Sequence, residues 1–256
     1  MKFDIITLTY NSEETLLETL KSIKSQTEVS IHHIILDGKS KDQTLRILKK
    51  NQIKDTSKII RNRKGIYKDL NFAIKKCRND IVGILHSDDV FYSQNILKTI
   101  KKKFQNSKAN VIYGDVVYIN KNNKNTVRNW IANSNFYKNK VLNNIVYKNL
   151  LKKGWMPPHT SIFIKKKHLK KIGPYNENYL ISSDYDFIIR TFKHKKSNIL
   201  YMPTKIVKMK IGGISNKSIK NLIIKSCEDY QIIKRNNLGG FFTLLYKNLS
   251  KVKQYF

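Results

Sequence analysis

Short apolar runs alternate with segments of helical periodicity through the first half of the chain, and this alternation constrains the fold more than any other feature. The segments between the runs carry apolar residues at helical spacing. Strands that alternate with helices predict an α/β fold with a mostly parallel sheet flanked by helices. The runs cover 3–9, 31–36, 58–60, 81–85 and 110–118, and the helical segments cover 11–26, 40–50, 67–76 and 93–104.

Two of these helices carry a start signal. Asn11 with Glu14, and Ser40 with Gln43, have the spacing of a capping box, in which two side chains bond the free N–H groups of the first turn. We therefore expect helices to begin directly after Asn11 and after Ser40.

The second half is less regular. Residues 120–151 are polar and rich in Asn and Lys, and we expect a loop or helical insertion that covers a site. Beyond Pro157, the turn at Gly173-Pro174 separates further elements. We expect strands at 160–164 and 199–202, and helices at 166–172, 184–192, 219–234 and 241–255.

Polar residues stand where three of the predicted strands end. They are Thr9, Tyr10 and Asn11 after the first run, Asp37 and Gly38 after the second, and Ser87, Asp88 and Asp89 after the fourth. In open α/β sheets, ligands bind beyond the carboxyl ends of the strands. These residues are therefore expected to form the lip of one pocket.

The adjacent carboxylates Asp88 and Asp89 are the strongest local signal for chemistry. Two such groups are costly to hold together unless a cation or a donor neutralises them. A Mg²⁺ or Mn²⁺ ion that also binds diphosphate oxygens is a common solution. The alternative is a solvated turn in which Asp89 caps the next helix. Asp37 can accept from a nucleoside base or ribose, or can be a turn residue.

Three further candidates lie in the second half. Asp184 and Asp186 open a predicted helix, where acids are favoured by the helix dipole, and either can be a general base. Asp186 and Arg190 are four residues apart and can instead form an ion pair. His159 follows two prolines and can contact phosphate, metal or acceptor, or can simply be packed.

Seven blocks together resemble, in order, the motifs of family 2 glycosyltransferases with the GT-A fold. The blocks are Ile6–Asn11, Leu36–Thr44, Lys64–Asp69, Leu85–Asp89, Tyr113–Asp115, Pro158–Thr160 and Ser183–Arg190. The resemblance covers about 3–215. It implies one GT-A domain at 1–215, with a nucleotide-sugar-binding half at 1–118 and an acceptor-side half at 119–215. Residues 216–256 would follow as a basic amphipathic helical tail.

The resemblance implies a donor site for a nucleoside-diphosphate sugar, commonly a UDP-sugar. Asp88 would hold Mn²⁺ or Mg²⁺ on the diphosphate, with His86 and His159 as further candidate ligands. The remaining roles would fall to Thr9, Tyr10 and Asn11 in the nucleotide pocket, Asp37 at the base, Asp89 beside the metal or ribose, and Lys64 or Arg63 at the phosphates.

The resemblance also implies an inverting hexosyltransferase. Asp184, with Asp186 as the alternative, would take a proton from the acceptor hydroxyl, and His159 and Arg190 would lie on the acceptor side. We expect a non-processive enzyme of the type that builds bacterial cell-surface polysaccharide or lipopolysaccharide. His86 and Ser183 depart from the family pattern, where an acid would be expected. They leave open a degenerate GT-A domain that binds nucleotide without catalysis.

The chain is strongly basic. It has 50 Lys and Arg residues but only 18 Asp and Glu, which gives a net charge of +32. Such a surface attracts anionic partners, although AT-rich codon usage also produces Lys-rich chains. A nucleic-acid-binding protein is disfavoured, because no recognisable binding motif is present and the acids cluster at strand ends. A nucleotidyltransferase would carry a Gly-rich basic loop after the first strand, where Asn11-Ser12-Glu13-Glu14 stands.

The C-terminal segment has apolar residues at helical spacing with lysines between them. The apolar residues are Phe241, Leu245, Leu249, Val252 and Phe256, and the lysines are Lys247, Lys251 and Lys253. A basic amphipathic helix of this kind can lie on an anionic membrane, or can pack on its own domain. With no secretory signal or apolar stretch of about 20 residues, we expect a cytoplasmic protein that can bind the inner face of the membrane. Its acceptor would be a glycan or a lipid-linked glycan.

Overall fold

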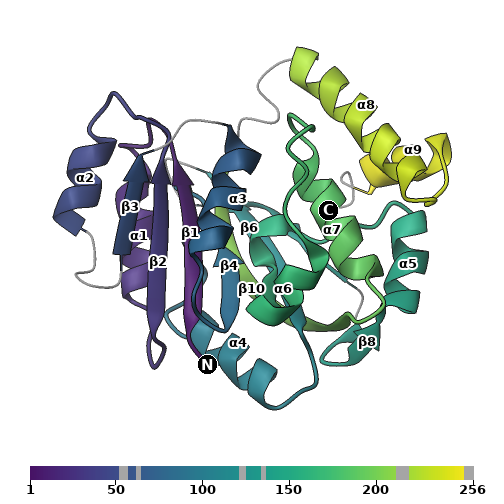
Figure 1. The fold of residues 1–256 in the computed structure, drawn as a ribbon, viewed down its shortest axis with the longest axis horizontal. Helices are drawn as coiled ribbons and strands as arrows, with labels where there is room; N and C mark the ends of the chain where they lie inside the picture. The colour runs from purple at the N-terminus through teal and green to yellow at the C-terminus, as the bar shows by residue number, and fades with distance from the viewer. Residues whose placement is uncertain (52–56, 62–64, 121–124, 134–136, 212–218, 251–256) are drawn as a thin grey trace.

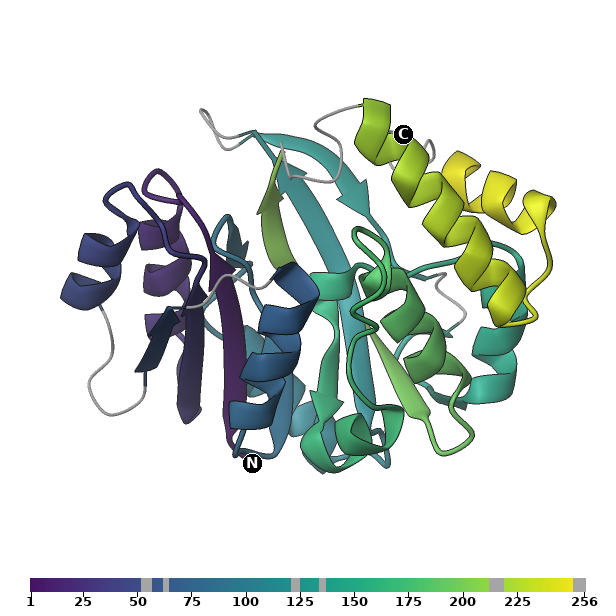
Figure 2. The ribbon, with the colours of Figure 1, turned by 45° about the horizontal axis from the view of Figure 1, so that its top comes forward.

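The structure is a computed structural model that describes six ranges of the chain. The described residues are 1–51, 57–61, 65–120, 125–133, 137–211 and 219–250. A mixed ten-stranded sheet runs through the molecule in the order β3-β2-β1-β4-β9-β6-β10-β5, with β7 paired to β6 and β8 to β10. The predicted α/β fold is confirmed, with helices on both faces of the sheet (Figure 1, Figure 2).

The amino-terminal part of the sheet is parallel, as predicted, and the rest is mixed. Antiparallel β9 lies between β4 and β6, β10 runs parallel to β6, and β5 runs antiparallel to β10. The strands are β1 (Phe3–Thr9), β2 (Ile31–Asp37), β3 (Ser57–Arg61), β4 (Ile81–Ile84), β5 (Asp89–Phe91), β6 (Val111–Ile119), β7 (Thr126–Trp130), β8 (Val141–Asn143), β9 (Phe163–Lys165) and β10 (Asn198–Lys210).

Three hydrophobic clusters of described residues hold helices against the sheet. One joins α3, α5, α6, α7 and α8 to one face, and another joins α1 and α4 to the opposite face. The smallest packs α1 and α2 on β2 through Leu16, Leu20, Ile35 and Leu48. The helices are α1 (Leu16–Lys24), α2 (Thr44–Asn51), α3 (Ile66–Lys76), α4 (Ile96–Gln105), α5 (Asn144–Lys152), α6 (Lys166–Ile172), α7 (Ser183–Lys193), α8 (Ile219–Arg235) and α9 (Phe241–Leu249). No described helix is long and apolar enough to span a bilayer.

Both predicted capping boxes are wrong. Helix α1 begins at Leu16 and α2 at Thr44, several residues later than the boxes predict. The Asn11 Oδ1 accepts instead from the backbone N–H of Lys41 at 2.9 Å, and the Ser40 Oγ donates to Asp37. Asn11 and Ser40, whose side chains could cap a helix, instead form hydrogen bonds that join the loops after β1 and β2.

The region 120–151 is more ordered than predicted where it is described. It supplies the edge strands β7 and β8 and the helix α5, whose start is capped by Asn143 Oδ1 accepting from Ile145 N–H at 3.1 Å. Tyr147 and Leu151 of α5 are fully buried in the larger cluster. The strand predicted at 160–164 is a 3₁₀ turn, His159–Ser161, followed by β9. The strand predicted at 199–202 extends to Lys210.

The two C-terminal helices pack on the rest of the molecule. Ile232, Ile233 and Leu238 belong to the larger core cluster, and Figure 2 shows α8 and α9 lying against α7 and α5. Lys247 is only 2% exposed. Of the two alternatives for this segment, the described part of the helix packs on its own domain, and Lys247 is buried in that contact. Residues 251–256, with Lys251, Val252, Lys253 and Phe256, lie outside the described ranges.

Close contact between Gly154 and α9 generates a stability prediction. Gly154 has φ 75°, and a Cβ there would overlap the backbone nitrogen of Lys247 and lie 2.8 Å from the Thr243 carbonyl oxygen. Gly154→Ala should lower the free energy of unfolding by about 2–4 kcal/mol, from roughly 1 kcal/mol of backbone strain and 1–3 of overpacking. Urea unfolding measures the change.

The matched control is Gly173→Ala. Gly173 has φ 85° and ψ −177°, a conformation that essentially glycine alone adopts, but open space around its Cβ position, so backbone strain of about 1–3 kcal/mol is expected without overpacking. A loss of about 1 kcal/mol or less in Gly154→Ala, which backbone strain alone would give, would contradict close packing of α9 on Gly154.

Candidate active site

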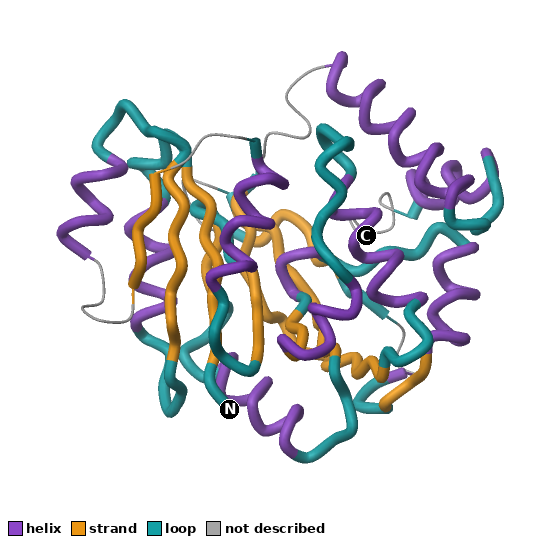
Figure 3. The backbone as a smooth tube through the Cα atoms, in the orientation of Figure 1, coloured by secondary structure: helices purple, strands orange, loops and turns teal. Residues whose placement is uncertain are grey.

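The carboxyl ends of β1 and β2 meet side by side. Thr9 pairs with Asp37 in the parallel register, and the Gly38 N–H donates to the Thr9 carbonyl at 2.8 Å. The Tyr10 side chain lies over Gly38, where an added Cβ would be 3.2 Å from the Tyr10 ring. Tyr10 is 43% exposed. A flat aromatic surface therefore covers the junction of the two strand ends. Figure 3 shows the path of the backbone in the loops above β1 and β2.

Hydrogen bonds lock the loops after β1 and β2 to one another. The Asn11 N–H donates to the Ser40 Oγ at 2.9 Å, and the Ser40 hydroxyl in turn donates to the Asp37 Oδ1 at 2.5 Å. The Ser12 N–H donates to the Thr44 Oγ1 at 2.8 Å. Asn11 has φ 47°, a left-handed conformation that Asn tolerates better than most residues. Asp37 is fully buried at the base of this arrangement.

The loop after β4 joins the same edge. The Ser87 and Ser12 hydroxyls lie 2.9 Å apart, and the backbone carbonyl of Asp89 accepts from the Thr19 Oγ1 at 2.8 Å. The three strand ends that the sequence places at one pocket lip are thus brought together.

The two carboxylates of this loop differ in environment. Asp88 is partly exposed, whereas Asp89 is 1% exposed and its Oδ2 has no hydrogen-bond partner among the described residues. Burial, reinforced by the charge of Asp88, raises the pKa of Asp89 well above its usual value, although Lys210 opposes this. Asp89 is therefore the more easily protonated carboxylate, and Asp88 is the one placed to meet a ligand.

Two histidines stand beside these acids. The rings of His86 and His159 are 6.4 Å apart, and the His159 Nε2 lies 2.6 Å from the Tyr175 hydroxyl. Burial, with the neighbouring His86, lowers the pKa of His159 to about 3. Burial also lowers the pKa of His86, against the opposing charge of Asp88. Both imidazoles are neutral at physiological pH, the form in which imidazole can bind a metal.

The described residues hold no group of three His, Cys, Asp or Glu side chains placed to bind a metal ion. A hard divalent cation that also binds diphosphate needs only one or two protein carboxylates. The partly exposed Asp88, beside the partnerless Oδ2 of Asp89, fits that smaller requirement.

Asp184 lies in the first turn of α7, and its Oδ1 accepts from the Tyr185 N–H at 2.8 Å. Burial raises the pKa of Asp184, and the charges of Lys247 and Lys225 partly offset that effect. The Tyr67 hydroxyl of α3 donates to the Ile181 carbonyl in the loop before α7. A carboxylate with a raised pKa therefore stands at this end of α7.

An aromatic stack connects this carboxylate to the histidines. The Tyr67 and Tyr175 rings are stacked, with their centres 6.0 Å apart. The Tyr175 hydroxyl is hydrogen-bonded to His159, and burial, together with the charge of Asp184, raises the pKa of Tyr175. Sequence reasoning assigned no role to Tyr67 or Tyr175. Tyr67 lies within a motif block, but Tyr175 carries no local signal, because its partners come from distant segments.

Asp186 and Arg190 form the ion pair that their spacing allows. The Arg190 Nε donates to the Asp186 Oδ2 at 2.8 Å, and its other nitrogens donate to the carbonyls of Ile172 and Pro174 at 2.8 and 2.7 Å. These bonds tie α7 to the end of α6. The geometry therefore favours Asp184 over Asp186 as a base. Lys64 and Arg63 lie outside the described residues.

Solved structures share this fold. The structure of Staphylococcus aureus TarS residues 1–349 in complex with UDP-GlcNAc aligns with a TM-score of 0.72 and 19% identity, covering 92% of this chain and 65% of that one. The mannosyltransferase PcManGT from Pyrobaculum calidifontis, in complex with GDP-Man and Mn²⁺, aligns with a TM-score of 0.63 and 14% identity, covering 99% and 69%. The fold is therefore that of GT-A glycosyltransferases.

Sequence relatives agree. A PGL/p-HBAD biosynthesis glycosyltransferase of Mycobacterium tuberculosis is 25% identical over 228 residues, covering 87% of this chain and 82% of the relative. The poly(ribitol-phosphate) β-N-acetylglucosaminyltransferase TarS of S. aureus is 34% identical over 103 residues, covering 38% of this chain and 18% of TarS. The family model described as "Glycosyl transferase family 2" matches residues 4–173. Because that match spans about two thirds of the sequence, the chain belongs to glycosyl transferase family 2, and it is a glycosyltransferase.

Proposed function

We propose that the protein transfers a sugar from a UDP-sugar to a hydroxyl of a glycan or lipid-linked acceptor, by a single inverting displacement. The observation that carries the proposal is the convergence of the ends of β1, β2 and β4 at one edge, joined by the Thr9–Asp37 pairing and the Ser12–Ser87 contact. The solved TarS complex with UDP-GlcNAc, which has the same fold, supports the choice of a UDP-sugar.

On the donor side, the nucleotide would lie over the locked loops. Tyr10 offers an exposed ring beside Gly38, and the left-handed turn at Asn11 presents backbone groups. Thr9 and Asp37 would complete the nucleotide pocket, with Lys64 at the phosphates. Asp88, supported by Asp89 and the neutral His86, would hold Mn²⁺ or Mg²⁺. When bound, such a cation stabilises the negative charge of the departing diphosphate.

On the acceptor side, Asp184 would take the proton from the attacking hydroxyl. A general base works best when its pKa approaches the working pH, and burial raises the pKa of Asp184 in that direction. His159, held by Tyr175, would contact the acceptor or the transferred sugar. As pH falls through the raised pKa, Asp184 becomes protonated and the rate of transfer should fall.

The donor site is tested by ligand-induced thermal stabilisation. UDP with Mn²⁺, at about 100 times its dissociation constant, should add roughly 2.7 kcal/mol to the free energy of unfolding. Asp88→Ala should abolish the metal-dependent part, because it removes the carboxylate proposed to hold the metal. Asp80→Ala is the control, since Asp80 is an exposed acid at the opposite end of β4. GDP, dTDP and CMP serve as comparison nucleotides. If neither UDP nor any of these three stabilised the protein, with or without metal, the proposed donor site would be contradicted.

The base is tested by Asp184→Asn. We expect UDP binding to persist and the transfer rate to drop by at least about 100-fold, because the proton acceptor is lost. Release of UDP, followed with glycan and lipid-linked acceptors, measures the rate. Asp186→Asn should chiefly lower stability, because it leaves Arg190 without its carboxylate. Wild-type turnover by the Asp184 variant would contradict the assignment.

Peripheral binding to an anionic membrane, with a cytoplasmic location, is also proposed. Helix α9 exposes Phe241, Phe242, Tyr246 and Leu249, at 64%, 72%, 56% and 53%. The net charge of +32 complements acidic lipid. Burying two Phe side chains is worth several kcal/mol, so Phe241→Ser with Phe242→Ser should weaken binding to phosphatidylglycerol vesicles at least about tenfold.

Co-sedimentation with vesicles measures that binding. Ile131→Ser, an exposed apolar side chain outside α8 and α9, is the control and should leave binding unchanged. Equal binding by wild type and the double variant would remove α9 from the proposal.

A further inference from the structure

The loop that leads into Asp184 is held by a single carboxylate from α8. Glu228 is 9% exposed and accepts three backbone N–H bonds, from Leu180 at 2.7 Å, Ile181 at 3.0 Å and Ser182 at 2.8 Å. In the same loop, the Ile181 carbonyl accepts a hydrogen bond from the Tyr67 hydroxyl. Three charge-assisted bonds on consecutive N–H groups fix the path of the chain just before the proposed base.

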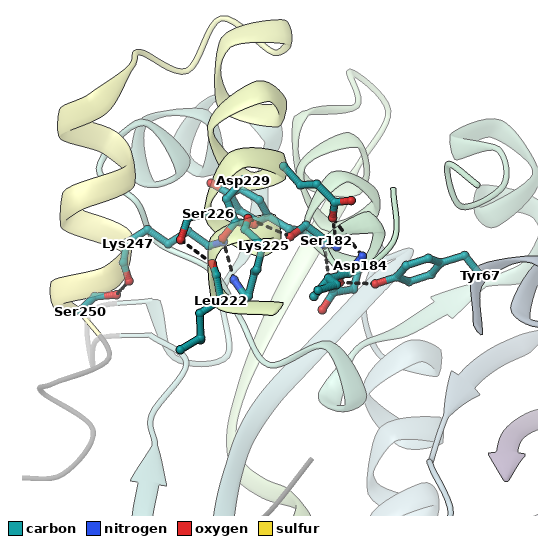
Figure 4. A network of polar contacts seen from close by, with 12 residues as sticks. Tyr67, Ser182, Asp184, Leu222, Lys225, Ser226, Asp229, Lys247 and Ser250 are labelled. Atoms are coloured by element: carbon teal, nitrogen blue, oxygen red, sulfur yellow. Dashed lines mark hydrogen bonds and ion pairs between the residues drawn. The ribbon is translucent and has the colours of Figure 1, made fainter. Parts of the chain in front are cut away.

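The next residue of α8, Asp229, forms ion pairs with two lysines. The Asp229 Oδ2 accepts from the Lys225 Nζ at 2.6 Å and from the Lys247 Nζ of α9 at 2.5 Å (Figure 4). Asp229 is 1% exposed and Lys247 is 2% exposed. The Lys247 ammonium also lies 3.6 Å from the centre of the Tyr185 ring. Burial opposes the ionisation of Asp229, but the two lysines outweigh it and lower its pKa.

The two lysines and Asp229 together carry one net positive charge. Asp184 is a further carboxylate that both lysines reach electrostatically, since Lys247 and Lys225 each lower its pKa. With Asp184 ionised, these two cations are matched by two anions. Such balance reduces the cost of burying charges, so the lysines oppose the effect of burial, which raises the pKa of Asp184.

We propose that α8 and α9 form part of the active site, because they hold the base Asp184 in place and supply the cations that oppose its protonation. The inference rests on the proposed role of Asp184. Its positioning residues lie beyond residues 4–173, which the family model covers. They are Lys225, Glu228 and Asp229 of α8 and Lys247 of α9.

The charged and titratable groups around Asp184 come from four segments. These groups are Tyr67 of α3, Tyr175, the carboxylate of Glu228 that binds the loop before α7, and the group of Asp229, Lys225 and Lys247. The tyrosines have pKa values raised by burial and stay neutral. The charges near Asp184 are therefore those of the two lysines, Asp229 and Glu228.

The test is a direct titration of Asp184 by carbon NMR in full-length protein labelled at the aspartate Cγ. Asp184→Asn identifies the resonance by its loss. Lys247→Met removes a cation, so the pKa of Asp184 should rise by about one unit. Asp229→Asn removes an anion, so the pKa of Asp184 should fall by about one unit. Lys220→Met, at an exposed position of α8, should leave it unchanged.

A pKa of Asp184 that rises in the lysine variant and falls in the Asp229 variant indicates a charge effect. Damage to packing would not change the sign of the shift between the two variants. Lys225→Met provides a second removal of a cation at a less buried position and should also raise the pKa. Shifts of the same sign in Lys225→Met and Asp229→Asn, or no shift in either, would overturn the inference. If Asp184→Asn retains transfer activity while the shifts occur, the proposed function fails and the electrostatic link stands.

The positioning role is tested by amide hydrogen exchange. Glu228→Gln keeps the shape but loses the charge and one acceptor oxygen, so the N–H groups of Leu180, Ile181 and Ser182 should exchange at least about tenfold faster. Exchange in the core strand β1 reports global stability. Unchanged exchange at 180–182 would show that Glu228 does not hold this loop.

Discussion

The hydrogen bonds between the loops after β1 and β2 are the constraint on which the proposed donor half of the site depends. Parallel strands place Thr9 beside Asp37 by register alone, but register does not fix the loops beyond them. The hydrogen bonds that run from Asp37 through Ser40 to Asn11 fix these loops. They also stabilise the left-handed conformation of Asn11, which would otherwise be costly. With these loops rigid, the exposed Tyr10 ring is held in one place before any ligand arrives, which lowers the entropy lost on binding.

The acceptor half is built differently, from segments far apart in the chain. Asp184 comes from α7, its stacked neighbours from α3 and the loop before α7, and its cations from α8 and α9. The helices that supply these cations follow the segment shared with the family model. A shared scaffold can therefore keep the donor chemistry of the family while later helices set the behaviour of the base. This division agrees with the general observation that function is carried by sites placed on a common fold.

The alternation of strands and helices was predictable because hydrophobic periodicity is a local property. The strand at 3–9 and the helix at 166–172 have the bounds that their sequences predict. The capping boxes failed because Asn11 and Ser40 bond partners about 30 residues away or across a turn, which no local pattern reveals. The partner of Lys247 could not be predicted for the same reason, because its ammonium binds Asp229 on another helix. The strands β7 and β8 were not predicted, and each is paired with a longer strand, β6 or β10.

The large positive charge of the protein does not by itself determine the state of its buried acids. Charges more than about 8–10 Å apart in physiological salt are largely screened, so most of the surface lysines contribute little at Asp184. Lys225 and Lys247 act because they are enclosed with it, where the effective dielectric is lower. The same enclosure raises the pKa of Asp184 through lost hydration, so burial and the lysines oppose one another. A base needs this compromise, since a carboxylate exposed to water is too weak to take a proton and one buried alone is already protonated at neutral pH.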